Sequence, residues 1–228
     1  MKMIELQFPA LGSEILADHG HALYGAISHL VPKIHAAEMP LRIGPLRGSY
    51  VGNGKLRLEP RGSRLCIRVR PDDLPLLLPL AGKSLNLDGH AVRLGVPEVA
   101  GLVPAPTLFA RLVVLKASSP KQDAAVKKSR DVEKTKRYQE PAEFLAAIRR
   151  ELERQGIGAE ADLPLHEAGD HVGQPCRHVV RIHKKKIVGF SVLVQGLTAE
   201  ESLTLQEKGI GGRSKMGCGF FVPVKENK

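Results

Sequence analysis

The chain has 228 residues, of which 43% are hydrophobic and 25% are charged. This length allows one large domain or two small ones with buried cores, and the composition excludes a globally disordered or fibrous chain. The 34 Lys and Arg residues outnumber the 24 Asp and Glu residues, and the formal net charge is +10. Such an excess favours a polyanionic partner, with nucleic acid ahead of an anionic membrane surface.

The sequence predicts a cytoplasmic protein. No apolar run approaches the roughly 18 residues that a membrane-spanning helix needs, and residues 1–5 lack the apolar stretch of a signal peptide. The three cysteines, Cys66, Cys176 and Cys218, are widely spaced and form no Cys-x-x-Cys pair. We therefore expect reduced thiols rather than a disulfide framework or a structural zinc site.

Residues 1–100 predict the element order β-α-β-β-α-β with one extra strand. The segment between Asp18 and Pro32 places apolar side chains on one helical face, with Asp18 as the N-cap and Pro32 as the stop. These side chains are Leu23, Ala26, Ile27 and Leu30. Strand patterns bounded by Gly and Pro turns occupy residues 3–8, 41–50, 55–58, 64–70 and 84–94, and a short helix is expected at 72–80.

After a Pro-containing linker at residues 99–106, residues 101–228 predict the same order again. Strands are expected at 107–116, 178–183, 187–194 and 219–224, and an amphipathic helix at 141–155. Thr198 and Glu201 form a capping-box pattern for a short helix that ends at Gly209. The basic segment 120–138 is expected to be a mobile loop that contacts RNA. The two halves together predict an α+β protein with antiparallel sheets, built from tandem ferredoxin-like domains at 1–100 and 101–228.

A glycine-rich, basic segment precedes the last predicted strand. Five glycines fall at positions 209, 211, 212, 217 and 219, and glycine at this density weakens helices and strands. It suits a tight backbone path whose N–H groups approach an anion, with charge added by Arg213 and Lys215. The alternative is a flexible turn between a helix and an edge strand.

The end of this segment, Gly217-Cys218-Gly219-Phe220, resembles the C-terminal glycine motif of the CRISPR-associated endoribonucleases that cut the repeats of precursor CRISPR RNA. These enzymes are members of the RAMP superfamily. The longer stretch 196–219 is similar to the subfamily first noted in myxobacterial CRISPR loci. The resemblance implies two ferredoxin-like domains and RNA binding, although non-cleaving RAMP subunits share the motif.

The family's chemistry, as the resemblance implies it, requires no metal and no cofactor. The ribose 2′-hydroxyl attacks the adjacent phosphate and leaves a 2′,3′-cyclic phosphate and a 5′-hydroxyl. Histidine suits such proton transfers because an imidazole titrates near neutral pH. By similarity to family members, the site consists of Tyr24 and His35, with His29 as the alternative histidine and His19 as a further candidate. Each of these side chains also has a structural interpretation, as a capping neighbour or as part of a solvated helix face.

Basic and glycine residues in both halves are the candidates for RNA contacts. They are Arg42, Arg47, Arg149, Arg150, Lys184, Lys185, Lys186, Gly211, Gly212, Arg213, Ser214, Lys215, Gly217 and Gly219. The histidines and the cysteine between residues 166 and 183 are spaced too irregularly to predict a metal site.

The expected partners are precursor and mature CRISPR RNA, together with other CRISPR-associated effector subunits, and no membrane. Two other functions fit the same fold and charge. One is a non-catalytic RNA-binding RAMP subunit of a CRISPR ribonucleoprotein complex, and the other is a general ferredoxin-like RNA-binding module.

Overall fold

The structure is a computed structural model that describes residues 2–35, 39–115, 140–182 and 185–224. It divides into two compact units. The first contains the chain up to Leu102 together with Ser214–Gly217, and the second contains Val103–Arg213 and the residues from Cys218 onward. The basic segment 120–138 and Lys184, both expected to contact RNA, lie outside the described residues.

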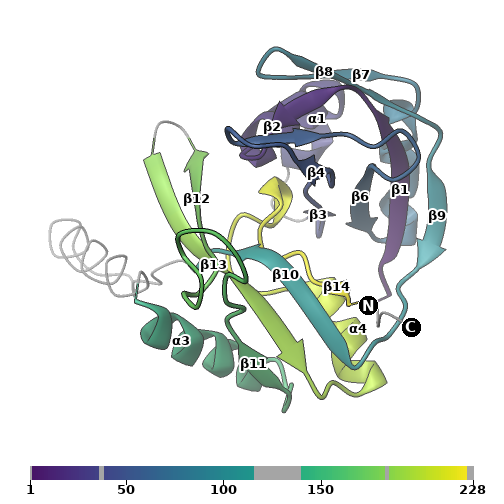
Figure 1. Ribbon diagram of the computed structural model, residues 1–228. Coiled ribbons are helices and arrows are strands. Elements are labelled where there is room, and N and C mark those ends of the chain that lie inside the picture. Colours follow the sequence, from purple (N-terminus) through teal and green to yellow (C-terminus); the bar gives the residue numbers. More distant parts are fainter. Residues whose placement is uncertain (1, 36–38, 116–139, 183–184, 225–228) are drawn as a thin grey trace, which may run out of the picture. The chain divides into compact units, whose positions relative to one another are not determined.

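Both units combine helices with antiparallel sheets (Figure 1), so the predicted α+β class is confirmed. Every pairing between the named strands of the described chain is antiparallel. Within the same residues, no helix is long and apolar enough to cross a membrane. All three cysteines are free thiols.

The first unit is built around β1 (Ile4–Leu11), which pairs with β6 (Arg64–Val69) on one side and with β9 (Glu98–Gly101) on the other. Alternate side chains of β1 are buried because successive residues of a strand point to opposite faces. The short strand β3 (Arg42–Ile43) extends the sheet beyond β6, and β8 (His90–Leu94) and β7 (Ser84–Leu87) continue it from the end of β1. Strand β9 was not predicted, because its residues overlap the expected linker.

Helix α1 (Gly20–Leu30) contributes Leu23 and Ile27 to the core beneath this sheet. Leu30, expected on the same buried stripe, is 39% exposed because the helix ends there. The predicted N-cap is wrong by one residue: His19, not Asp18, occupies this position, and its side chain makes no capping hydrogen bond. After Val31 the chain enters a 3₁₀ turn, η1 (Pro32–His35).

The helix expected at residues 72–80 is also wrong in type, since two short 3₁₀ helices stand there. They are η2 (Pro71–Leu76) and η3 (Leu78–Leu80). Pro75 and Pro79 lack the backbone N–H that an α-helix needs, so only short i→i+3 turns form. Leu77 and Leu80 nevertheless reach the core.

The strand expected at 41–50 is divided in two at Gly44-Pro45. Pro45 has no backbone N–H and cannot donate a hydrogen bond to a neighbouring strand. Its second part, β4 (Ser49–Tyr50), joins β5 (Lys55–Arg57) and the unpredicted β2 (Glu14–Leu16) in a small three-stranded sheet. Glu14 forms ion pairs with both Lys55 and Arg57 on this sheet.

The second unit has a sheet in the order β11-β13-β10-β14, with β12 paired to β13. The strands are β10 (Thr107–Val113), β11 (Glu160–Asp162), β12 (Arg177–Ile182), β13 (Lys185–Gln195) and β14 (Val222–Pro223). Strand β11 was not predicted because three residues are too few to show an alternation.

Helices α3 (Pro141–Arg154) and α4 (Ala199–Lys208) pack against this sheet (Figure 1). Their buried apolar side chains share one core with those of β10 and β13. Phe144 of α3 contacts Phe190 of β13 with ring centroids 4.8 Å apart. The predicted capping box is confirmed: the Thr198 side chain accepts from Glu201 N, and the Glu201 carboxylate accepts from Thr198 N. Glu201 also accepts from Gly158 N, which ties the helix start to the preceding loop.

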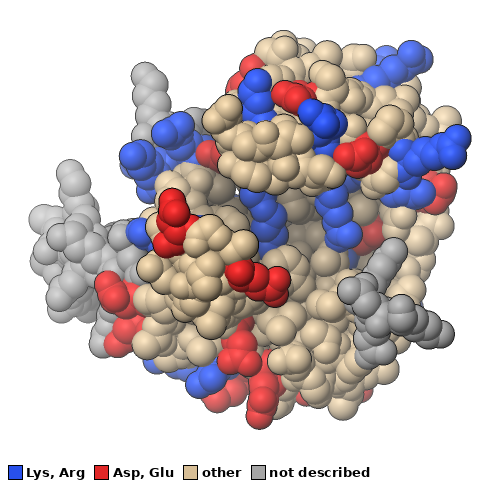
Figure 2. Space-filling view, in the orientation of Figure 1, with Lys and Arg blue, Asp and Glu red and all other residues tan. Residues whose placement is uncertain are grey.

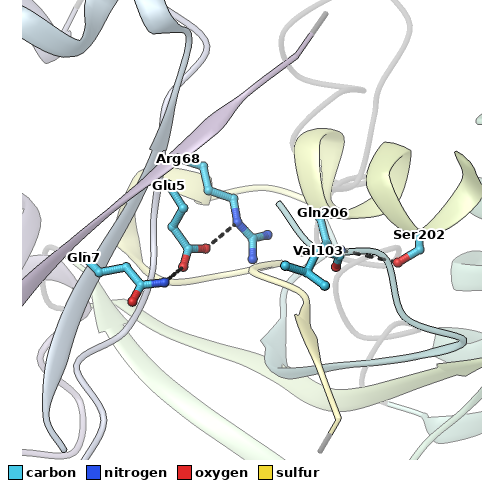
Figure 3. A network of polar contacts seen from close by, with 6 residues as sticks. All are labelled: Glu5, Gln7, Arg68, Val103, Ser202 and Gln206. Atoms are coloured by element: carbon cyan, nitrogen blue, oxygen red, sulfur yellow. Dashed lines mark hydrogen bonds and ion pairs between the residues drawn. The ribbon is translucent and has the colours of Figure 1, made fainter. Parts of the chain in front are cut away.

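Two buried polar groups are drawn in Figure 3, one in each unit. In the first, the 1% exposed side chain of Arg68 donates from Nε to Glu5 at 2.9 Å, and Gln7 donates to the same carboxylate. In the second, Gln206 donates to the Val103 carbonyl and to Ser202. Removing one partner of a buried ion pair such as Glu5–Arg68 leaves an uncompensated buried charge. We therefore expect the stability of the first unit's sheet to depend on this pair.

The half-buried side chain of His178 on β12 is expected to make the second unit sensitive to acid. Its Nε2 lies 3.0 Å from Ser191 Oγ, and Ser191 in turn donates to the Arg111 carbonyl. Burial, which has the largest effect, and the nearby positive groups of Arg111 and His166 together lower the pKa of His178 to about 4. The unfolded chain therefore binds this proton at a higher pH than the folded chain, so stability is lost as the pH falls from about 6.5 towards 4.

We predict that His178→Gln reduces the loss of unfolding free energy at acid pH, because glutamine keeps an N–H donor but cannot take up a proton. Between pH 7 and about pH 4.5 the original chain should lose roughly 2 kcal/mol more unfolding free energy than the variant. Urea denaturation at a series of pH values measures the difference. Parallel pH profiles for the two proteins would show that His178 does not cause the acid sensitivity.

Candidate active site

Tyr24 and His35 meet at one point on the first unit. The Tyr24 hydroxyl lies 2.8 Å from His35 Nδ1, and the two rings contact edge to face with centroids 5.4 Å apart and an interplanar angle of 78°. His35 is exposed and Tyr24 is half-buried against the core. The structure thus brings together the two residues that the resemblance singled out first.

The backbone below this pair explains why they meet. Helix α1 ends when the Val31 N–H donates to Ile27, and Pro32 starts the 3₁₀ turn η1. Val31 and Ile34 are both buried in the core and hold the turn at each end. His35 follows Ile34 directly, so its side chain returns towards Tyr24, which lies earlier on the helix.

The hydrogen bond leaves two arrangements of protons on the imidazole. If His35 Nδ1 carries the proton and donates to Tyr24, His35 Nε2 is a free base and the Tyr24 O–H can donate elsewhere. If Tyr24 donates to Nδ1, a neutral imidazole carries its proton on Nε2 and can act as an acid. The same pair can therefore serve either proton transfer of an RNA-cleaving reaction.

His29 stands on a different side of α1. It is exposed and follows Tyr24 by five residues, or about 140° around the helix. The structure therefore does not place it in the Tyr24–His35 pair.

His19 is in a structural position. It is only 2% exposed; its Nε2 accepts from Leu46 N at 2.9 Å and its Nδ1 lies 2.8 Å from the Leu16 carbonyl. Because Nε2 accepts, Nδ1 must carry the proton and donate to Leu16, so the ring is neutral and both nitrogens are occupied. We therefore do not assign His19 a proton transfer.

Part of the glycine-rich segment belongs to the first unit and contacts the turn that carries His35. Lys215 Nζ donates to the Ile34 carbonyl at 2.5 Å. A Cβ at Gly20, the first residue of α1, would clash with the Met216 carbonyl, so this glycine permits a close backbone approach. No local pattern predicts this role of Gly20, because Met216 lies 196 positions away along the chain.

The glycines of this segment that belong to the second unit have their own internal partners. Gly212 N donates to the Val114 carbonyl and Gly219 N to the Leu112 carbonyl. Gly211 and Gly219 have φ of +83° and +63°, and a Cβ on either would collide with backbone. The expectation that these N–H groups cradle phosphate is therefore not supported at 212 and 219, where they hold the segment to β10 and to the residue after it instead.

The residues expected to contact RNA differ in exposure. The exposed cations are Arg47, Arg150, Lys185, Lys186 and Arg213. In the glycine-rich segment, Ser214 and Lys215 are half-buried and Gly217 is buried. Arg42 is only 9% exposed and stands beside Arg68 in the β3–β6 register. Burial, with a smaller effect of Arg68, lowers the pKa of Arg42 to about 10.

Arg149 has acidic surroundings. It donates to the Ala161 carbonyl and lines a cavity of about 530 Å³ together with Glu153, Glu160 and Asp162. Figure 2 shows several Asp and Glu side chains on this side of the second unit, around α3 and β11. A phosphate would be repelled by these carboxylates, so Arg149 is poorly placed for an RNA contact.

Among the residues that the structure describes, no group of three or more His, Cys, Asp and Glu side chains is arranged to hold a metal ion. His166 and His171 stand near each other, with ring centroids 5.9 Å apart. We therefore assign no metal ligands within the described ranges.

The geometry of His19 leads to a stability prediction. His19→Ala leaves the buried Leu46 N–H without its acceptor, which should cost about 2 kcal/mol of unfolding free energy. His29→Ala on the exposed side of the same helix should change it by less than about 0.5 kcal/mol. Urea denaturation followed by circular dichroism compares the two. Equal stabilities would mean that His19 has no structural role.

Comparisons with known proteins agree with this architecture. A family model described as Cas6 Crispr matches residues 4–226. The CRISPR-associated endonuclease Cas6 of Myxococcus xanthus (strain DK1622) is 34% identical over 230 residues, which cover 98% of this chain and 82% of that protein.

Two solved structures show the same fold over nearly the whole chain. One, a CRISPR-associated protein Cas6, has a TM-score of 0.56 at 14% identity and covers 98% of this chain and 99% of its own. The other, a RAMP protein that binds different RNA substrates, has a TM-score of 0.58 at 10% identity and covers 99% of this chain and 100% of its own. The predicted tandem ferredoxin-like fold and the predicted resemblance are both confirmed, and the chain belongs to the Cas6 family of CRISPR-associated proteins.

Proposed function

We propose that this protein is an endoribonuclease that cleaves the repeats of precursor CRISPR RNA to release guide RNAs. The hydrogen bond between Tyr24 and His35 is the observation that carries the proposal, because it sets an imidazole and a phenol side by side on the surface. The 34% identity to a relative named as an endonuclease supports it. The net charge of +10 supports an RNA substrate.

The proposed reaction uses the RNA's own nucleophile. A base removes the proton of the ribose 2′-hydroxyl, and the 2′-oxygen attacks the neighbouring phosphorus. The bond from phosphorus to the 5′-oxygen breaks, and an acid supplies a proton to that oxygen. The products are a 2′,3′-cyclic phosphate and a 5′-hydroxyl, and no water enters the step.

We assign His35 to one of the two proton transfers through Nε2, because Nδ1 already contacts Tyr24. The Tyr24 hydroxyl then either keeps the imidazole in the required tautomer or donates to a phosphate oxygen that gains negative charge. Each well-placed group of this kind contributes roughly 10² to 10⁴ in rate.

The exposed cations are assigned to the RNA backbone. Arg47 in the first unit and Arg150, Lys185, Lys186 and Arg213 in the second present charge to solvent, where phosphate oxygens can reach it. We leave the buried Arg42 and the acid-flanked Arg149 out of this set. Each unit then contributes side chains that contact the RNA phosphates, and only the first unit contributes the groups that transfer protons.

The experiment is single-turnover cleavage of a labelled repeat transcribed from the CRISPR array of the same genome. We expect cleavage to continue in excess EDTA, because the mechanism needs no metal ion. We expect His35→Ala to lower the rate constant at least roughly 10²-fold with little change in RNA affinity. His29→Ala is the matched control and should cleave at nearly the original rate.

Three outcomes would contradict the proposal. Full activity of His35→Ala would remove this imidazole from the reaction, and loss of activity in His29→Ala alone would move the site onto the helix. Tight binding of the repeat without cleavage by the unmodified protein would favour a non-catalytic RNA-binding subunit.

A further inference from the structure

Lys215, expected to contact RNA phosphate, makes a contact within the protein that points to another role. Its ammonium group donates to the carbonyl of Ile34, the residue immediately before His35, across a sequence separation of 181 residues. Both residues belong to the first compact unit. The contact therefore links the glycine-rich segment to the turn that carries the proposed imidazole.

The backbone that follows Lys215 is held in place by two neighbours. Met216 lies so close to Gly20 at the start of α1 that a Cβ on Gly20 would clash with the Met216 carbonyl. The next residue, the buried Gly217, has a φ of +80° and lies against Pro45. The segment Ser214–Gly217 is thus wedged against the helix and the β3 region, and Lys215 starts from a fixed backbone.

The ammonium itself is partly withdrawn from water. Lys215 is half-buried, and burial lowers its pKa. A hydrogen bond from a charged donor in such surroundings is stronger than one in bulk solvent, so the Ile34 carbonyl is held firmly. An exposed lysine free to follow a phosphate would have neither feature.

We propose that Lys215 is a positioning residue for His35: by fixing the Ile34 carbonyl, it holds the 3₁₀ turn η1 so that His35 Nδ1 stays against the Tyr24 hydroxyl. This inference rests on the proposed cleavage by His35. It assigns to the glycine-rich segment a part in the chemical step, in addition to any part in binding RNA.

The alternative role as a phosphate contact predicts a different loss. A lysine that only neutralises phosphate contributes to the affinity for RNA, so its removal raises the dissociation constant and leaves the rate constant at saturation unchanged. A positioning residue contributes to the rate constant at saturation, because a misplacement of about 1 Å can cost roughly 10²-fold.

The test compares Lys215→Met with Lys33→Met and Lys215→Arg. Lys33 is an exposed lysine of the same 3₁₀ turn, so its replacement removes the same charge close by without touching the Ile34 carbonyl. Dissociation constants are measured with a repeat RNA that carries a 2′-deoxy nucleotide at the cut, and rate constants with the natural repeat at saturating protein.

We expect Lys215→Met to lower the saturating rate constant at least roughly tenfold, with a change in affinity no larger than that of Lys33→Met. Lys215→Arg should recover most of the rate, because a guanidinium can donate to the same carbonyl. A loss confined to affinity, or a rate equal to that of Lys33→Met, would overturn the inference.

A second readout does not depend on cleavage. In the RNA-free protein, the imidazole NMR signals of His35 should shift in Lys215→Met but stay in place in Lys33→Met and Lys215→Arg. Unchanged His35 signals in Lys215→Met would also overturn the inference.

If the unmodified protein does not cut the repeat, the proposed function fails, yet these spectra still decide whether Lys215 positions His35. If Lys215→Met does not fold, Lys215→Arg decides alone, and a lost rate or a shifted His35 signal in it overturns the inference.

Discussion

The hydrogen bond between the Tyr24 hydroxyl and His35 Nδ1 is the interaction on which the functional account depends. One of its members is exposed and the other half-buried, so the contact relies on the backbone beneath for its geometry. That backbone is fixed by the burial of Val31 and Ile34 and by the Lys215 contact to the Ile34 carbonyl. A site assembled in this way is preorganised by the core rather than by its own side chains.

The glycine-rich segment acts first as a structural element. Its glycines allow close backbone contacts at Ile210 and Val114 that a Cβ would prevent. Two of its N–H groups hold it to β10 and to Val114, the residue after this strand. Arg213, in contrast, remains exposed at a φ of +64°. Charge on this segment is therefore available to RNA mainly through side chains, and its backbone serves the fold.

The sequence predicted most of the longer helices and strands and the capping box at Thr198, because periodicity and caps are local signals. It missed the short strands β2, β9 and β11, which have too few residues or overlap an expected linker. The choice of Tyr24 and His35 came from the resemblance. Local patterns could not show that Arg42 is buried beside Arg68, or that Lys215 reaches Ile34, because strand register and contacts between distant residues depend on the tertiary fold. The position of His19 at the start of a helix is compatible with a capping residue or with a buried residue of the core. Only the two hydrogen bonds of its ring show that it is a buried structural residue.

Attack by the ribose 2′-hydroxyl is tested with a repeat RNA in which a single 2′-deoxy nucleotide replaces the ribose beside the scissile phosphate. We expect this RNA to bind with unchanged affinity and to remain uncut, whereas the natural RNA is cut to a 2′,3′-cyclic phosphate. Cleavage of the 2′-deoxy RNA at the same phosphate would show that another nucleophile attacks, and it would contradict the role given to the Tyr24–His35 pair.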